Sequence, residues 1–320
     1  MSITVPVPKT VMSRFVVAAD EVPKDPYAMA RAQVTGPPGE EVLDRLGTPL
    51  LRIRAVAAAD SIWHGDLAAV AAADDERDRL GAAAGHLIIE SETAPEARPR
   101  MAQAVRAVAR ALAETTGGLL ADLCTAQLVP PDRRADGERD WFRVADGWLG
   151  IDCVINADGG MDADKPTECA CLCLFTRGLS RFGLPELVID RVACAYDLAA
   201  TNVMRGLAVR LLGRLWADPD ARELRLDESI VVEPEDMWGY WGARPLFGLP
   251  VPVRLADAGR SDLPSGVRHL ELLPHPNFRG TRAEWGAEVL NEGLPSVAGW
   301  QPDTPPYRID RQPVPLTEGG

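Results

Sequence analysis

Residues 168–192 read ECACLCLFTRGLSRFGLPELVIDRV, and this stretch decides the predicted fold. Cys169, Cys171 and Cys173 alternate with small or apolar residues, so a strand here would place the three thiols on one face. The other face would also be apolar, which is typical of a strand at the centre of a sheet covered on both sides. Since proline cannot donate to a strand ladder, the next strand is expected to begin after Pro185. The stretch therefore predicts two core strands joined by a turn.

The three cysteines could also be read as metal ligands. Neighbours on one face of a strand lie roughly 6.5–7 Å apart, too far to share one ion unless the strand bends. Zinc sites usually use a Cys-x2-4-Cys pair with a second pair elsewhere, whereas the spacing here is Cys-x-Cys-x-Cys on an extended backbone. A buried free cysteine behaves as a small hydrophobic side chain. We therefore expect the thiols to be packing residues, with no metal and no cofactor.

Composition limits the classes of partner. The chain has 320 residues, 46% of them hydrophobic, and a net charge of −13 from 47 acidic and 34 basic side chains. This balance disfavours nucleic acid and anionic membranes and suits a basic protein partner. No apolar run reaches the roughly 18 residues that a membrane helix needs, and no secretory signal is evident. Six cysteines in a chain of this length do not resemble a disulfide framework, so a cytoplasmic location is expected.

Residues 86–129 predict a β-α-β unit. The segment HLIIES at 86–91 is typical of a strand. An apolar stripe at helical spacing runs from Met101 to Leu112, and residues 119–129 are predicted as the next strand. A strand, a helix and a strand joined without a long loop form a β-α-β unit.

A hairpin and a long helix are predicted on either side of the central stretch. Asp146-Gly147 is a strong hairpin signal and would join strands at 141–144 and 148–157. Residues 197–216 carry apolar side chains at every fourth position, which predicts a helix.

These patterns predict an α+β protein with a mixed or antiparallel sheet, packed helices and a proline-rich C-terminal arm. Twelve of the 27 prolines lie at or beyond residue 245, where the apolar periodicity fades. Proline-rich chain favours extended conformations and buries little apolar surface. The expected domains are N-terminal strands with a short helix at 1–60, an α+β core at 61–244, and the arm at 245–320.

Three side chains are candidates for catalysis. His86 and Glu90 would share a face of a regular strand, a pairing suited to acid–base work or metal binding. The alternative is that both are polar groups bonded to neighbours at a strand end. Asp122 is the third candidate, for an enzyme with a pocket near the central strands.

The segment DMWGYW supplies the candidate binding residues Trp238, Tyr240 and Trp241. Large aromatic side chains dominate the binding energy of many protein interfaces. The same side chains could instead form a plug that seals one end of a core.

Several enzyme motifs are missing from the sequence. There is no phosphate loop ending in Lys-Ser or Lys-Thr, no Gly-x-Ser-x-Gly and no His-Glu-x-x-His. The absence of Gly-x-Gly-x-x-Gly after a strand counts against a dinucleotide-binding fold.

The phrase TRGLSRFGLPELVI, at residues 176–189, resembles a motif in uncharacterised bacterial domains near the suppressor-of-fused-like families. In those domains a strand ends, a Gly-Leu pair follows, and a Phe-Gly-x-Pro-Glu-Leu phrase opens the next strand. The similarity extends over residues 50–235 in the order of elements, with a strand that begins at His86. The resemblance implies an α+β domain that binds other proteins, in some cases as an immunity protein against a toxin. It supplies no agreed catalytic residues, so none are carried over.

The leading functional prediction is therefore a cytoplasmic, non-catalytic protein-interaction module, with an immunity or regulatory role and a basic protein partner. The alternatives are an enzyme of unknown reaction and a structural subunit of a larger assembly. The sequence does not predict the oligomeric state.

Overall fold

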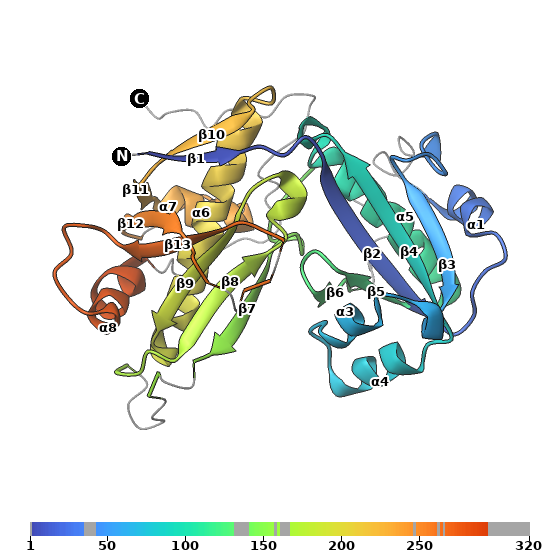
Figure 1. Ribbon diagram of the computed structural model, residues 1–320, viewed down its shortest axis with the longest axis horizontal. Helices are drawn as coiled ribbons and strands as arrows, with labels where there is room; N and C mark the ends of the chain where they lie inside the picture. Colours follow the sequence, from blue (N-terminus) through green and yellow to red (C-terminus); the bar gives the residue numbers. More distant parts are fainter. Residues whose placement is uncertain are drawn as a thin grey trace. The chain divides into compact units, whose positions relative to one another are not determined.

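The computed structural model describes residues 2–34, 43–130, 141–156, 159–160, 167–245, 248–260, 263–264 and 266–293. The chain forms two compact units, one of residues Pro8–Phe142 and one that combines Met1–Val7 with Arg143–Gly320 (Figure 1). We call them the Pro8–Phe142 unit and the thiol unit, since the latter contains the cysteines of the central stretch.

The Pro8–Phe142 unit is built on an antiparallel sheet with the strand order β3-β4-β2-β5-β6. The strands are β2 (Val11–Ala19), β3 (Arg52–Ala57), β4 (Gly85–Thr93), β5 (Leu119–Asp122) and β6 (Gln127–Leu128). The helices are α1 (Pro26–Gln33), α3 (His64–Ala68), α4 (Asp74–Ala82) and α5 (Arg100–Thr116), with 3-10 turns at Ala58–Asp60 and Pro95–Ala97.

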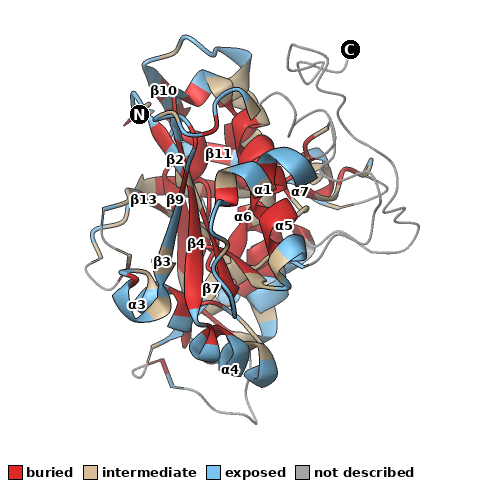
Figure 2. Ribbon diagram, turned by 90° about the vertical axis from the view of Figure 1, so that its right-hand side faces the viewer, coloured by how far each residue is buried: buried red, intermediate tan, exposed pale blue. Residues whose placement is uncertain are grey.

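Helix α5 packs on one face of this sheet, against β2, β4 and β5. The predicted stripe from Met101 to Leu112 is buried, and the helix ends at Gly117, whose φ of 64° suits glycine. On the opposite face, α3 and α4 contribute Leu67 and Leu80 to a second apolar cluster. Figure 2 shows the difference in burial between α5 and the more exposed α3 and α4.

The predicted β-α-β unit is confirmed, with one strand inserted. β4 and β5 each pair antiparallel with β2, so they run parallel to each other with β2 between them. The predicted strand at 119–129 is two strands, because the chain turns between β5 and β6 and Ala126 adopts a φ of 53°. The unit is therefore a split β-α-β arrangement followed by a short hairpin.

The thiol unit contains a mixed sheet with the order β11-β12-β13-β9-β8-β7, in which only the β13–β9 pair is parallel within the described residues. Its strands are β7 (Gly150–Ile155), β8 (Leu172–Arg177), β9 (Glu186–Val192), β11 (Ser229–Val232), β12 (Val251–Asp257) and β13 (His269–Pro274). A separate ribbon pairs β1 (Ser2–Pro6) with β10 (Glu223–Asp227). The helices are α6 (Asp197–Ala217), α7 (Pro234–Trp241) and α8 (Arg282–Trp285), with 3-10 turns at Ser180–Phe182, Cys194–Tyr196 and Asn291–Gly293 and a π-helical turn at Gly286–Leu290.

Helix α6 confirms the predicted helix and packs against β8, β9 and α7. Its positions Val203, Leu207 and Leu211 are fully buried. At Gly206 an added Cβ would lie 2.7 Å from Met237 Cγ, so only a residue without a side chain allows α6 and α7 to approach this closely. Across the described residues no helix is both long enough and apolar enough to cross a membrane.

The expected domain boundaries at 60 and 244 do not separate the two units, because strand pairing crosses both. β2 and β3 pair with β4 across the first boundary, and β11 pairs with β12 across the second. The prediction of an irregular arm was wrong for β12 and β13, whose residues Val251, Val253 and Leu255 are buried in the sheet. The arm beyond residue 293 lies outside the described residues.

The predicted hairpin at Asp146-Gly147 was also wrong. Residues 144–148 form a turn in which Arg143 Nη2 lies 2.8 Å from Asp146 Oδ1 and Gly147 has a φ of 82°. β7 starts only at Gly150 and pairs with β8. Asp146 therefore lies in a turn that includes a local ion pair, and no strand is formed between residues 141 and 149.

Candidate functional site

The three candidate catalytic side chains do not come together. Glu90 pairs with Arg14 on β2, whereas Asp122 pairs with the next residue, Phe15. Since successive residues of a strand point to opposite faces, Asp122 lies on the other face of the sheet from Glu90 and from His86, which is four residues away on β4. The sheet itself therefore separates Asp122 from His86 and Glu90.

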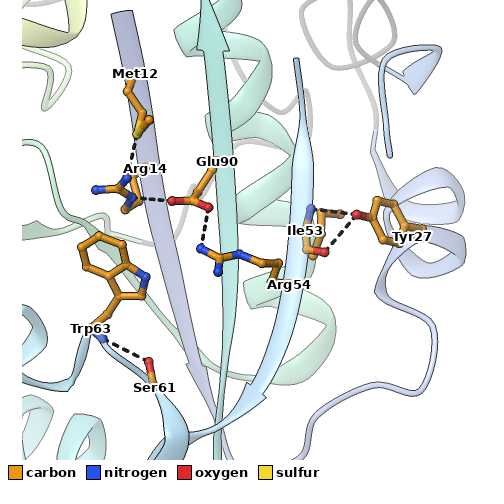
Figure 3. A network of polar contacts seen from close by, with 8 residues as sticks. All are labelled: Met12, Arg14, Tyr27, Ile53, Arg54, Ser61, Trp63 and Glu90. Carbon is orange, nitrogen blue, oxygen red and sulfur yellow. Dashed lines mark hydrogen bonds and ion pairs between the residues drawn. The ribbon is translucent and has the colours of Figure 1, made fainter. Parts of the chain in front are cut away.

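Glu90 is held in an ion-pair network on the face opposite α5 (Figure 3). Its two carboxylate oxygens accept hydrogen bonds from Arg14 Nε and Arg54 Nη2, each at 2.6 Å. The Arg14 guanidinium also lies 4.0 Å from the centroid of the Trp63 ring. Burial alone would raise the pKa of Glu90, but the two arginines hold it below its usual value. Glu90 is thus an ionised bridge between strands, not a base tuned for proton transfer near neutral pH.

His86 is fully buried, and within the described residues neither ring nitrogen has a hydrogen-bond partner. Burial lowers its pKa, and the nearby His64 lowers it further, so the imidazole is neutral. Along β4 the His86 and Glu90 Cα atoms are about 13 Å apart, and Ile88 fills the space between them as part of the core. His86 and Glu90 share one face of β4, as expected, but the two side chains do not form a pair there.

The aromatic candidates lie inside the thiol unit. Trp238 and Tyr240 are buried on α7, and Tyr240 meets the Trp241 ring edge to face with the centroids 4.8 Å apart. The Arg205 guanidinium of α6 lies 4.9 Å from the Tyr240 centroid. These contacts correspond to the plug that closes a core, and as the chain stands the two buried rings are not a surface for a partner.

The phrase at residues 176–189 runs from the end of β8 through the connecting loop into the start of β9. The buried carboxylate of Glu186 accepts hydrogen bonds from Thr176 Oγ1 at 2.8 Å, from Gly178 N at 2.9 Å and from Ser180 N at 3.0 Å. Burial raises the pKa of Glu186 despite these donors. The polar residues of the phrase therefore hold the loop in shape from inside, which is a structural role.

Three thiols meet at one end of the mixed sheet of the thiol unit. The Sγ atoms of Cys169 and Cys171 are 3.4 Å apart, those of Cys169 and Cys194 are 3.4 Å apart, and those of Cys171 and Cys194 are 2.9 Å apart. Cys169 and Cys171 are buried, and Cys194 is partly exposed. We call these residues the thiol triad; within the described residues they are the one group of three or more ligand-type side chains close enough to share an ion.

The triad differs from the arrangement expected from sequence. Cys169 and Cys171 precede β8, so they do not follow the strand geometry that argued against a shared ion. Cys173 lies on β8 and packs instead with Phe175, Val188 and Leu263. The prediction that Cys169, Cys171 and Cys173 share one strand face was therefore wrong, and Cys194 was missed as the third member.

A β-bulge brings Cys194 to the other two thiols. Leu172 pairs with Val192 whereas Leu174 pairs with Ile189, so β9 has one extra residue between these pairs. Arg191 lies in this bulge and adopts a φ of 58°. This left-handed conformation costs a non-glycine residue of order 1 kcal/mol or more. Bulges redirect the strand that follows them. Here the chain turns into the 3-10 turn that starts at Cys194.

The last three residues of β7 form an apolar edge of the same sheet. β7 is the end strand, and in the described part of the chain its other side has no paired strand. Its final residues Cys153, Val154 and Ile155 are all exposed, with Ile155 at 57%. By contrast β11, at the opposite edge, alternates exposed and buried residues. We call residues 153–155 the β7 edge.

No protein-family model, curated protein or solved structure matches this chain.

Proposed function

We propose that this chain is a protein-interaction module and that a partner docks as an added strand on the β7 edge. The observation that carries the proposal is the run of three consecutive exposed apolar residues on an end strand. On an ordinary solvent-facing strand, polar side chains alternate with buried ones. A run that is exposed on both faces of the strand is unfavourable in water unless another chain covers it.

Strand addition suits this edge physically. An end strand presents unpaired backbone N–H and C=O groups, which a partner strand can pair with. Val154 and Ile155 point to opposite faces, so each would contact a different side chain of the partner. Backbone pairing would supply affinity, and the side-chain contacts would supply selectivity.

Charge favours a basic partner. The net charge of −13 would steer a cationic protein toward the chain, and such steering weakens as salt screens it. The resemblance of residues 176–189 to domains that bind other proteins supports the same class of function. More specifically, we propose an immunity or regulatory role for this module.

The test compares two edge strands of one sheet. Tagged full-length chain is used to capture partners from an extract of its source at low and at moderate salt, with the wild type, Ile155→Ser and Val231→Ser side by side. Val231 is an exposed residue on β11 and serves as the matched control. We expect a basic protein that is captured by the wild type and the control and is reduced at least tenfold with Ile155→Ser.

Equal capture by all three chains would contradict docking on the β7 edge. Capture that is unchanged by salt would contradict a basic partner steered by charge. Light scattering of the purified chain addresses the alternative of a structural subunit. If the wild type forms a dimer or larger assembly and Ile155→Ser is monomeric, the added strand comes from a second copy of the chain.

A further inference from the structure

We propose that the thiol triad Cys169, Cys171 and Cys194 binds one thiophilic metal ion, with zinc as the expected occupant. This inference does not depend on the β7 edge or on any partner.

The distances between the sulfur atoms fit a shared ion. A zinc–sulfur bond of about 2.3 Å in tetrahedral geometry places ligand sulfurs about 3.8 Å apart. The three Sγ–Sγ separations are 3.4, 3.4 and 2.9 Å, so small side-chain rotations would open the triangle to that size. All three separations are well beyond the S–S bond length of about 2.05 Å, so the thiols are free and surround one point.

The surrounding groups prepare one sulfur to carry negative charge. The backbone N–H of Cys194 donates a hydrogen bond to Cys169 Sγ at 3.2 Å. A hydrogen bond from a backbone N–H favours the thiolate form of a cysteine, which is the form that binds metals. Because each thiol must lose its proton to become a ligand, metal binding would release protons and weaken as the pH falls.

The backbone fixes the triad from two sides. On one side, the bulge at Arg191 directs the chain so that Cys194 follows at the start of its turn. On the other, Asn156 N donates to Cys171 O at 2.6 Å and Ala170 N donates to Gly159 O at 2.8 Å. An ion would clamp the connection between β7 and β8 to the connection between β9 and α6.

The close approach of Gly159 is part of this support. A Cβ on Gly159 would lie 2.4 Å from Cys171 Cα and 2.6 Å from the carbonyl oxygen of Ala170, so only glycine fits there without displacing the cysteine backbone. Both the strained residue at Arg191 and the side-chain-free position at Gly159 therefore act on the same three thiols. Backbone strain and close packing around one cluster are expected when its side chains must be held in a fixed geometry to bind a ligand.

The donor set selects the class of metal. Thiolates favour zinc or copper(I) and disfavour magnesium and calcium, which prefer oxygen ligands. Three protein ligands leave a fourth position, as in sites that hold water or an exogenous group. The fourth position is therefore open to water or to an exogenous group.

The experiment titrates the reduced, metal-free full-length chain with Co²⁺ and with Zn²⁺. Thiolate–cobalt charge-transfer absorption reports the ligands, and competition with a chromophoric chelator gives the zinc affinity. We expect one equivalent of zinc, and at least tenfold weaker binding for Cys169→Ser, Cys171→Ser and Cys194→Ser. Cys173→Ser is the matched control, since Cys173 is equally buried but packs in a separate cluster, and we expect its zinc affinity to be unchanged.

A second measurement keeps the proposal testable if a triad variant misfolds. In the wild-type chain, zinc should slow alkylation of the partly exposed Cys194 at least tenfold, and a chelator should restore the rate. The proposal is overturned if the reduced chain binds no stoichiometric zinc, or if Cys173→Ser binds as weakly as the triad variants. A Cys171–Cys194 disulfide in freshly purified chain, together with no zinc binding after reduction, would identify a redox pair instead.

Discussion

Replacing Glu186 tests whether the phrase between β8 and β9 is held together by one buried carboxylate. Glu186→Ala removes the acceptor of the hydrogen bonds from Thr176 Oγ1, Gly178 N and Ser180 N. Each buried donor left without an acceptor costs about 1–3 kcal/mol. Relaxation of the loop and removal of a poorly solvated carboxylate offset part of this sum. We expect the free energy of unfolding to fall by about 4 kcal/mol.

Glu186→Gln should cost much less, about 1 kcal/mol. Its amide oxygen can still accept from Gly178 N and Ser180 N, so these two bonds are kept. Its NH₂ group faces Thr176 Oγ1, which already accepts a hydrogen bond from Leu187 N at 2.7 Å. The threonine hydroxyl then loses its acceptor, which accounts for the remaining cost.

The pH dependence has a definite sign. Burial raises the pKa of Glu186 above its ordinary 4.5, so the folded chain holds this proton more tightly than the unfolded chain. The stability that this group contributes is greatest below pH 4.5 and declines as the pH rises through the folded pKa. The penalty of Glu186→Gln relative to the wild type should therefore be larger at acidic than at neutral pH.

Urea unfolding monitored by tryptophan fluorescence measures these differences, because Trp148 contacts Phe182 of this loop with the ring centroids 6.5 Å apart. Hydrogen exchange at the Gly178 and Ser180 amides supplies a local measurement, since the chain has two units and global unfolding need not be two-state. Glu223→Ala, at an exposed ion pair, is the control and should change stability by less than about 0.5 kcal/mol. The reasoning is refuted if Glu186→Ala is as stable as the wild type, or if Glu186→Gln becomes less harmful on acidification.

Two glycine substitutions give further predictions. Gly206→Ala places a Cβ 2.7 Å from Met237 Cγ and should lower the free energy of unfolding by about 2 kcal/mol, measured by urea denaturation; no loss would mean that α7 shifts freely on α6. Gly159→Ala should weaken zinc binding at least tenfold, because its Cβ would meet Cys171 Cα at 2.4 Å. Gly160→Ala is the control for the latter: Gly160 has a φ of 63° but open space around it, so alanine should cost about 1 kcal/mol of stability and leave zinc affinity unchanged.

Local periodicity was sufficient to predict the elements that form the core. The four-residue spacing in α6 predicted the buried side of that helix, the segment HLIIES predicted β4, and the chain after Pro185 predicted β9. Periodicity failed where proline was taken as a sign of irregular chain. Pro252 lies at the second residue of β12, and Pro274 is the last residue of β13, positions that a sheet tolerates.

The sites depend on long-range pairing, which local patterns do not specify. Asp122 and Glu90 could be assigned to opposite faces only after β2 was known to lie between β4 and β5. The approach of Cys194 to Cys171 depends on one extra residue in β9, which shifts the pairing beyond it. A cysteine 23 residues further along the chain carries no spacing signal in the sequence. Cys169 and Cys171 were expected on a strand, but β8 starts only at Leu172.

The β7 edge and the thiol triad are adjacent along the backbone, so an ion bound to the triad and a partner bound to the edge would affect each other. Ile155, the last residue of β7, pairs with Leu172, the residue next to Cys171. The following residue, Asn156, donates its N–H to the Cys171 carbonyl. An ion that orders Cys171 would also order the end of β7, so a partner strand would lose less conformational entropy on docking there. By linkage the partner would raise the affinity for the ion by the same factor as the ion raises the affinity for the partner. A metal that binds the triad without changing partner affinity would show that the ion stabilises the fold alone.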